Sequence, residues 1–280
     1  MRLHWFAPAG TLLAIGSAAL LAAGSGAGNS AITITACGQT VTASAVLGQD
    51  LSCSSSDGVD VGAPGVTIDL KGHVVTGGGG NFGVDDSGGY DGVTVKNGVL
   101  RGFEYGVRAL VGVDKLSVSN VVASGNSLSG IVVLGDFASV KSTTASGNNE
   151  VGVLVEGASA KIQSAVAAGN GAGGIEVIGP SAQVQSSTAS GNGNDGISVT
   201  GASTKIQSSS ASGNEDDGIH VVGNAARITG NRTDGNGFPG GASDNSGLGI
   251  EVGGYTTFPT GKNTARGNDD PVDCFPASIC

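Results

Sequence analysis

Aromatic side chains are scarce in this sequence of 280 residues: 4% of the positions are aromatic, and only one of them is Trp. Charged residues make up 13%, whereas 52 positions are Gly. So few rings and so much Gly leave little with which to fill a conventional globular core. Val, Ile and Ala are nevertheless plentiful and regularly placed, which argues against intrinsic disorder. We therefore expect a fold that buries small aliphatic side chains in a repeated pattern.

Basic clusters and long apolar runs are also missing beyond the N-terminal segment. The chain has 13 Lys and Arg against 23 Asp and Glu, a net charge of −10 at pH 7. An acidic chain without a basic run is a poor partner for nucleic acid or for an anionic membrane surface. No later stretch is apolar for long enough to span a bilayer. We predict no nucleic-acid partner and no transmembrane segment in the mature chain, and the sequence leaves the oligomeric state open.

The first 27 residues differ from everything that follows them. Arg2 and His4 precede an apolar run over residues 11–23, and small residues follow it at positions 25–27. A charged start, a short apolar core and a small-residue exit are typical of a secretory signal peptide. We assign residues 1–27 to a signal peptide and expect a secreted, periplasmic or cell-surface protein. The alternative interpretation is an N-terminal membrane anchor.

Four cysteines form two close pairs at opposite ends of the mature chain, Cys37 with Cys53 and Cys274 with Cys280. In an exported protein this distribution predicts two local disulfides. Closing loops this short stabilises a fold by roughly 2–3 kcal/mol each. A zinc site built from all four cysteines is the alternative, but the spacings match no common zinc pattern.

A repeat of 22 residues is the strongest signal in the chain. Three sets of positions recur at this interval. Gly-Asn begins at 125, 147, 169, 191, 213 and 235, and Gly-Ile or Gly-Val begins at 130, 152, 174, 196 and 218. Val or Ile occupies 118, 140, 162, 184, 206 and 228. Phased sets of this kind are the signature of a solenoid, in which each repeat stacks on the next.

Within each repeat the local period is two. Ile175-Glu176-Val177 and Ile219-His220-Val221 place apolar side chains on one face and a variable residue on the other. Alternation over three to five residues, interrupted by Gly, Asn and Ser, predicts short strands joined by tight turns. The Ile and Ala positions would form inward columns. The repeated Asn would form a column of carboxamides at the turn, hydrogen-bonded from coil to coil and tolerant of left-handed backbone angles.

We therefore predict an all-β fold, a single-stranded right-handed parallel β-helix of about nine coils with 22-residue repeats. Earlier coils fit the pattern less regularly, and Gly249-Ile250-Glu251-Val252 continues it after nine extra residues, which we place in a loop around residues 238–242. Stacked strands need covered ends. We assign residues 28–60 to an N-terminal cap, 61–268 to the β-helix and 269–280 to a C-terminal cap.

A family resemblance follows from these residues. The segments Cys37-Gly38-Gln39-Thr40-Val41, Leu51-Ser52-Cys53 and 65–73, with the later Ser-Gly-Asn and Gly-Ile-x-Val repeats, resemble exported bacterial right-handed β-helix repeat proteins. These belong to a broad group described as carbohydrate-binding and sugar-hydrolase-like, which includes polysaccharide lyases, epimerases and glycosidases. The resemblance covers nearly all of the mature chain. It implies the fold and a polysaccharide partner more than any one activity.

The outward positions of the Gly-Ile-x-Val strands supply the catalytic candidates. His220 and Glu251 fall one coil apart, and Glu176 falls two coils from His220. A histidine beside a carboxylate is the pairing that general acid–base catalysis uses. The alternative is that His220 is an ordinary surface residue.

Acidic residues gather at the turns that enter these strands. Asp195, Asp216 and Asp217 are candidates for a Ca²⁺ site, with Asp244 from the inserted loop nearby, because clustered carboxylates are the ligands that Ca²⁺ prefers. The alternative is that they are solvated turn residues. No other cofactor is predicted.

A column of cations, Lys161, Lys205 and Arg227, is predicted on the outer face of another strand set. It would suit an anionic sugar polymer, or it would keep the face soluble and discourage lateral association. The motifs of polygalacturonases and pectate lyases are missing, and few Tyr and no mature Trp remain to stack on sugar rings. We expect a non-catalytic protein that binds a polysaccharide or the cell envelope. The alternatives are a polysaccharide lyase or epimerase acting on uronate polymers, and a purely structural surface protein.

Overall fold

The computed structural model describes residues 31–110, 112–237, 248–253, 263–268 and 274–280. Residues 31–280 belong to one compact unit. The predicted signal peptide, the inserted loop with Asp244, and residues 269–273 lie outside the described residues. Among those described, no helix has the length and apolar character needed to cross a membrane.

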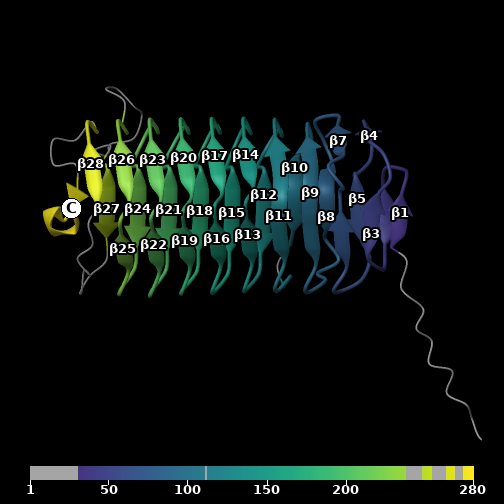
Figure 1. Cartoon of the computed structure of the whole chain (residues 1–280), viewed down its shortest axis with the longest axis horizontal. Coiled ribbons are helices and arrows are strands. Elements are labelled where there is room, and N and C mark those ends of the chain that lie inside the picture. Colours follow the sequence, from purple (N-terminus) through teal and green to yellow (C-terminus); the bar gives the residue numbers. More distant parts are fainter. Residues whose placement is uncertain (1–30, 111, 238–247, 254–262, 269–273) are drawn as a thin grey trace, which may run out of the picture. The chain divides into compact units, whose positions relative to one another are not determined.

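In the described part of residues 31–280, short parallel strands stack side by side and form three ladders (Figure 1). The first ladder contains β1 (Ile32–Ile34), β3 (Ala45–Leu47), β6 (Thr67–Asp69), β9 (Thr94–Arg101), β11 (Ser117–Ser124), β13 (Ser139–Lys141), β16 (Lys161–Gln163), β19 (Gln183–Gln185), β22 (Lys205–Gln207) and β25 (Arg227–Thr229). The second contains β4 (Leu51–Cys53), β7 (Val74–Gly77), β14 (Thr144–Ser146), β17 (Val166–Ala168), β20 (Thr188–Ser190), β23 (Ser210–Ser212), β26 (Arg232–Asp234) and β28 (Thr264–Arg266). The long strands β9 and β11 belong to both and join them into one 18-stranded sheet.

The third ladder is a separate sheet of 11 strands. It contains β2 (Gln39–Val41), β5 (Val59–Val61), β8 (Phe82–Asp86), β10 (Tyr105–Ala109), β12 (Ile131–Leu134), β15 (Val153–Glu156), β18 (Ile175–Ile178), β21 (Ile197–Thr200), β24 (Ile219–Val222), β27 (Ile250–Gly253) and β29 (Cys274–Phe275). Strands β2 and β5 extend this ladder into residues 28–60, and β29 extends it toward the C-terminus. The division of the chain into caps and β-helix stays a prediction.

The register of the ladders is the 22-residue repeat itself. In the third ladder Ile175 pairs with Ile197, and Ile197 pairs with Ile219. Each coil therefore contributes one strand to each ladder in the regular part of the chain, and identical positions lie directly above one another. The predicted parallel β-helix with 22-residue coils is confirmed. The one helix among the described residues is the 3₁₀ helix η1 (Ala277–Ile279).

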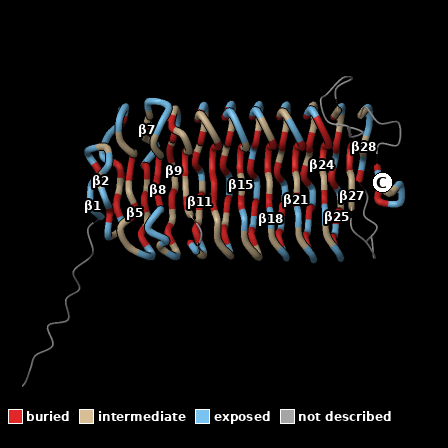
Figure 2. Tube along the Cα trace, turned by 180° about the vertical axis from the view of Figure 1, so that it is seen from behind, coloured by how far each residue is buried: buried red, intermediate tan, exposed pale blue. Residues whose placement is uncertain are grey.

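The core is a set of narrow aliphatic columns. Two predicted columns are fully buried: the Ile and Val column of the third ladder and the Ala column. Their residues are at most 1% exposed in every coil from residue 123 to residue 219. Figure 2 shows buried segments in each coil. Because the inward columns repeat Ala or the similar aliphatic side chains of Val and Ile, the interior is filled with few large rings, and Phe103 is the largest fully buried side chain.

A buried column of carboxamides runs beside the Ala column. In each Gly-Asn pair from Asn126 to Asn214, the Asn donates from its backbone N–H and its side-chain Nδ2 to Oδ1 of the Asn in the next coil, at 2.8–3.2 Å. The predicted coil-to-coil bonding is confirmed. The left-handed backbone lies one residue earlier, on the Gly of each Gly-Asn pair, with φ of 60–62°. Gly takes that conformation without the clash that a Cβ would cause, so these pairs do not use the tolerance of Asn for left-handed angles.

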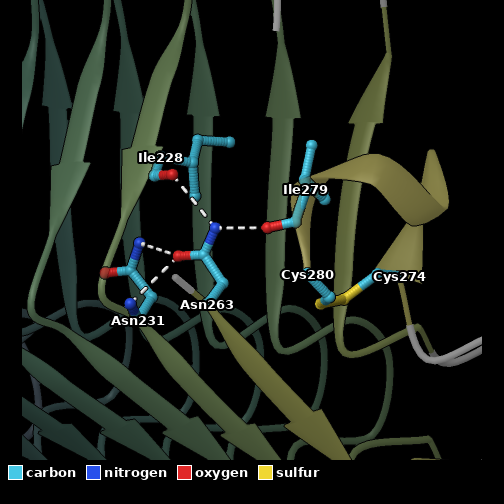
Figure 3. The surroundings of a disulfide bond; sticks show 6 residues. All are labelled: Ile228, Asn231, Asn263, Cys274, Ile279 and Cys280. Atoms are coloured by element: carbon cyan, nitrogen blue, oxygen red, sulfur yellow. Dashed lines mark hydrogen bonds between the residues drawn. A yellow bond between two sulfur atoms is a disulfide. The ribbon is translucent and has the colours of Figure 1, made fainter. Parts of the chain in front are cut away.

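Both predicted disulfides are present, Cys37–Cys53 and Cys274–Cys280. Near the second, Asn263 continues a carboxamide ladder from Asn231 and donates from Nδ2 to the carbonyl oxygens of Ile228 at 3.0 Å and Ile279 at 2.7 Å (Figure 3). The last described coil is thereby bonded to η1, the segment that the second disulfide closes.

Candidate functional site

The outward positions of the third ladder form one continuous column. They are Thr40, Asp60, Asp85, Arg108, Val132, Leu154, Glu176, Ser198, His220 and Glu251. His220 pairs directly with Glu251, and Ser198 separates His220 from Glu176. The sequence therefore placed these three side chains correctly, and their catalytic role stays a prediction.

Turn residues complete a cluster around His220. Asp195 lies just before β21 and Asp217 just before β24, so stacked turns bring the two carboxyls to the same edge of the sheet. The Nδ1 atom of His220 lies 3.2 Å from Oδ2 of Asp195. One ligand atom from each of Asp195, Asp217 and His220 falls within 4.8 Å of the others. We call these three residues, with Glu251, the His220 cluster.

The two aspartates of the His220 cluster are shielded from water, and His220 is half-buried. The side chain of Asp195 is 9% exposed and that of His220 is 30% exposed, while Asp217 is buried. The bond to Asp195 raises the pKa of His220 to about 9, helped by the charges of Asp217 and Glu251 and opposed by burial. Burial, with the side-chain bond to Glu251, raises the pKa of Asp217 to about 8. At neutral pH the imidazole is thus a cation and cannot act as a base.

The calcium candidates are only partly brought together. Asp195 and Asp217 converge, but the third member of their group is His220, and Asp216 is not part of it. An imidazole nitrogen is a ligand for transition metals and not one that Ca²⁺ favours.

Glu176, two coils away from His220, has its pKa raised by burial and by the charge of Asp195.

A second cluster near the start of the same column was missed from the sequence. Carboxylate oxygens of Asp57, Asp60 and Asp85 lie within 4.8 Å of one another. Asp85 accepts a hydrogen bond from Nε of Arg108 at 2.8 Å, and the Arg108 guanidinium lies 3.4 Å over the ring of Phe82. The available signal was Gly58-Val59-Asp60-Val61, an early and irregular copy of the Gly-Ile-x-Val strand.

A groove of about 470 Å³ lies along the first ladder, and its lining residues are Phe137, Ser139, Ser159, Lys161, Ser181 and Gln183. We call it the Phe137 groove. The Phe137 side chain is 53% exposed. Its backbone is left-handed, with φ of 59°, at a turn where the next coils carry Ser159 and Ser181 at φ of 60° and 61°. The groove was not predicted from the sequence, where its one signal is a Phe at a position that the next coils fill with Ser.

The predicted cation column borders this groove. Lys161, Gln183, Lys205 and Arg227 pair in register along β16, β19, β22 and β25. Lys141 on β13 adds a fourth cation to this face. The outward residues of these five strands include no carboxylate, and within the described part of the chain none of the four cations forms an ion pair. We call Lys141, Lys161, Lys205 and Arg227 the cationic strip.

A second hollow, of about 320 Å³, is lined by Gly112, Asp114, Leu134, Gly135, Asp136 and Glu156. Its aspartates have structural partners. Asp114 accepts from the backbone N–H of Asp136 at 2.9 Å, and Asp136 accepts from that of Ala158 at 2.7 Å. These bonds link successive turns, so Asp114 and Asp136 have a structural role in this hollow.

Comparison with known proteins agrees with this architecture. The chain is similar to the A-module of mannuronan C-5 epimerase AlgE4 from Azotobacter vinelandii, with a TM-score of 0.51 and 15% identity over 86% of this chain and 78% of that one. It is also similar to the A-module of mannuronan C-5 epimerase AlgE6 from the same organism (TM-score 0.43, 15% identity, 85% and 79% coverage) and to the Agl-KA catalytic domain (TM-score 0.44, 11% identity, 84% and 60% coverage). At such identities the likeness concerns the fold alone.

No curated protein matches the sequence. The family model described as the right handed beta helix region matches residues 129–274, just over half of the chain. With its parallel ladders and 22-residue coils, the chain belongs to the right-handed β-helix family.

Proposed function

We propose that this chain binds an acidic polysaccharide in the Phe137 groove and along the cationic strip. The observation that carries the proposal is Phe137, an exposed aromatic residue in a left-handed turn beside a row of cations that form no ion pair with any described residue. This combination offers a flat apolar surface for a sugar ring and positive charges for the acidic groups of the polymer.

The backbone conformation of Phe137 is energetically unfavourable for this residue. A left-handed backbone is unfavourable for a bulky side chain, and the following coils use Ser at this turn. An exposed aromatic ring in a strained turn contributes little to folding, and such strain is typical of binding sites. Aromatic rings present a rigid apolar face, which suits the C–H face of a sugar.

The positive charges of the cationic strip favour an anionic ligand. The protein as a whole carries a net charge of −10, yet this face presents four cations and no carboxylate from its strands. Parallel strands lie about 4.8 Å apart, which is close to the length of one sugar unit in an extended glycan. Cations on neighbouring coils, such as Lys205 and Arg227, would therefore meet neighbouring sugar units, whereas Gln183 leaves one coil of the column without a cation. The fold neighbour AlgE4 is a mannuronan epimerase, so a polysaccharide is a ligand that this architecture can take.

Binding to polygalacturonate, measured with the full chain at low and high salt, tests the proposal. The same polymer with its carboxylates methyl-esterified is the matched control. We expect binding to polygalacturonate that weakens as salt increases, and much weaker binding to the ester. Equal binding to both polymers, or no binding to polygalacturonate, would contradict the proposal.

Substitutions taken from the protein's own repeat locate the ligand. Phe137→Ser introduces the residue of the next coils, and loss of about 1 kcal/mol of aromatic contact should weaken binding roughly fivefold. Lys161→Gln with Lys205→Gln copies Gln183 and should cost about 2 kcal/mol, at about 1 kcal/mol for each cation. Phe275→Ser, which removes a similarly exposed ring, and Lys71→Gln should leave the affinity unchanged. If these controls weaken binding as much as the groove variants, the site lies elsewhere.

The His220 cluster favours a second candidate function, elimination or epimerisation of a uronate polymer. Its support is the hydrogen bond that orients His220 toward Asp195, with Glu251 on the next strand. Two features oppose it: the imidazole is protonated at neutral pH, and the surrounding carboxylates repel an anionic sugar. Incubation with polyuronates would yield unsaturated or stereochemically altered products that His220→Ala abolishes. Unchanged polymers across a broad panel would remove this candidate.

A further inference from the structure

The Asp195 and His220 side chains are spaced like two ligands of one metal ion. Zinc binds imidazole nitrogen and carboxylate oxygen at about 2.0–2.2 Å, so two ligand atoms of a tetrahedral site lie about 3.3 Å apart. The observed distance from Nδ1 of His220 to Oδ2 of Asp195 is 3.2 Å. An atom of Asp217 joins them within 4.8 Å.

The backbone fixes both carboxylates in this arrangement. Oδ1 of Asp195 accepts from the N–H of Asp217 at 3.2 Å, and Oδ1 of Asp217 accepts from the N–H of Leu248 at 2.7 Å. One oxygen of each carboxylate is held by the main chain, and Oδ2 of Asp195 is the oxygen that faces the imidazole. Orientation of ligands by a second set of hydrogen bonds is typical of metal sites.

From this donor set we propose that Asp195, Asp217 and His220 bind a divalent transition-metal ion of the Zn²⁺ type. Glu251 pairs with His220 across β24 and β27 and bonds to the side chain of Asp217, so it lies beside these ligands but is not part of the group whose atoms converge. Two carboxylates and one imidazole match the ligand types of Zn²⁺, whereas Ca²⁺ and Mg²⁺ take oxygen ligands. This site is separate from the Phe137 groove, so it does not depend on the polysaccharide proposal.

Two other groups in the chain lack this combination and serve as internal comparisons. Asp57, Asp60 and Asp85 offer only oxygen, and Arg108 already neutralises Asp85 at 2.8 Å. His73 and Asp50 form a histidine–carboxylate pair at 2.9 Å, without a third ligand in any described group. The pair of His73 and Asp50 therefore has the same kind of contact as His220 and Asp195 but offers too few ligands for a metal site.

Zn²⁺ titration into the full chain, after removal of metals with a chelator, tests the assignment by calorimetry. We expect one high-affinity Zn²⁺ per chain, a higher unfolding temperature with Zn²⁺, and visible absorption bands of tetrahedral Co²⁺ when Co²⁺ is used. His220→Gln and Asp195→Asn should each weaken Zn²⁺ binding by about tenfold or more. His73→Gln is the matched control and should bind Zn²⁺ like the unmodified protein.

Three outcomes would overturn the proposal. They are absence of a Zn²⁺-dependent heat and thermal shift, Ca²⁺ binding as tight as that of Zn²⁺, and loss of Zn²⁺ binding in His73→Gln but not in His220→Gln. Circular dichroism verifies that each variant retains its β-helix. The Co²⁺ spectrum of the unmodified chain needs no variant, so it decides the ligand geometry even where a substitution impairs folding.

Discussion

The side-chain Nδ2 of Asn170 donates a hydrogen bond of 2.9 Å to Oδ1 of Asn192, the residue 22 positions later. Both carboxamides are buried, and Asn170 also donates to the carbonyl of Ala145 at 3.2 Å. In return, Oδ1 of Asn170 accepts two bonds from Asn148. Each Asn is therefore both donor and acceptor in a chain of amides, which sets the vertical alignment of the coils.

Asn170→Ala should lower the free energy of unfolding by about 2–4 kcal/mol, because it leaves buried donors of Asn148 without acceptors. Chemical denaturation of the full chain measures the loss. Gln163→Ala, at an exposed position of the same coil, is the control and should change stability little. A loss no larger than that of the control would mean that the amide ladder contributes little to the fold.

Phe137→Asn should stabilise the protein by about 1 kcal/mol, since Asn tolerates the left-handed backbone that Phe adopts with strain. Little packing is lost because the ring is 53% exposed. Ser159→Asn, at the same turn of the next coil, should gain less. Measured unfolding midpoints distinguish the two, and destabilisation by Phe137→Asn would contradict the strain on which the binding proposal depends.

Asp60→Asn should stabilise the protein at neutral pH but not in acid. Burial, with the neighbouring Asp57 and Asp85, raises the pKa of Asp60 to about 6 from its ordinary value of 3.8. The folded chain then binds the proton more tightly than the unfolded chain, so stability is complete below about pH 4 and falls as pH rises to about 6. Asn has no charge to bury, and the variant avoids that loss.

Thermal unfolding of both proteins from acid to neutral pH measures this difference. The unfolding temperature of Asp60→Asn should exceed that of the unmodified protein by an amount that grows as pH rises from the ordinary pKa of 3.8 to the folded-state pKa of about 6. Above that pH the difference should stay constant. Glu215→Gln, at an exposed turn, serves as the control. A difference that is constant with pH, or one that widens toward acid, would show that Asp60 is not the group that titrates.

Loss of the first disulfide should destabilise the N-terminal coils. Cys37 and Cys53 are 16 positions apart, and opening a loop of this size costs about 3 kcal/mol in the loop-entropy account. Cys37→Ser with Cys53→Ser should lower stability by this order and speed amide hydrogen exchange in β1 to β5. Unchanged exchange in those strands would mean that stacking alone holds them.

The repeat made most of the fold predictable. Side chains 22 residues apart lie on one another, so the ladders and the inward columns follow from counting positions. The same holds for Lys161, Lys205 and Arg227. The alignment of His220 with Glu251 follows from the Gly-Ile-x-Val motif, which returns after nine extra residues. The early coils were less readable because the partners of Asp60, Asp85 and Arg108 are 25, 23 and 24 positions further along.

By itself the sequence determined the period, the direction in which strand side chains point and the columns that stack. The alternation of a strand fixes those directions whatever lies at the turns. Only the tertiary structure decided how turn residues meet strand residues: Asp195 beside His220, Asp217 beside Glu251, and Phe137 at the edge of a groove. The direction of a turn side chain depends on the backbone angles around it and on the coil beneath, and neither is encoded in the spacing of residues along the chain.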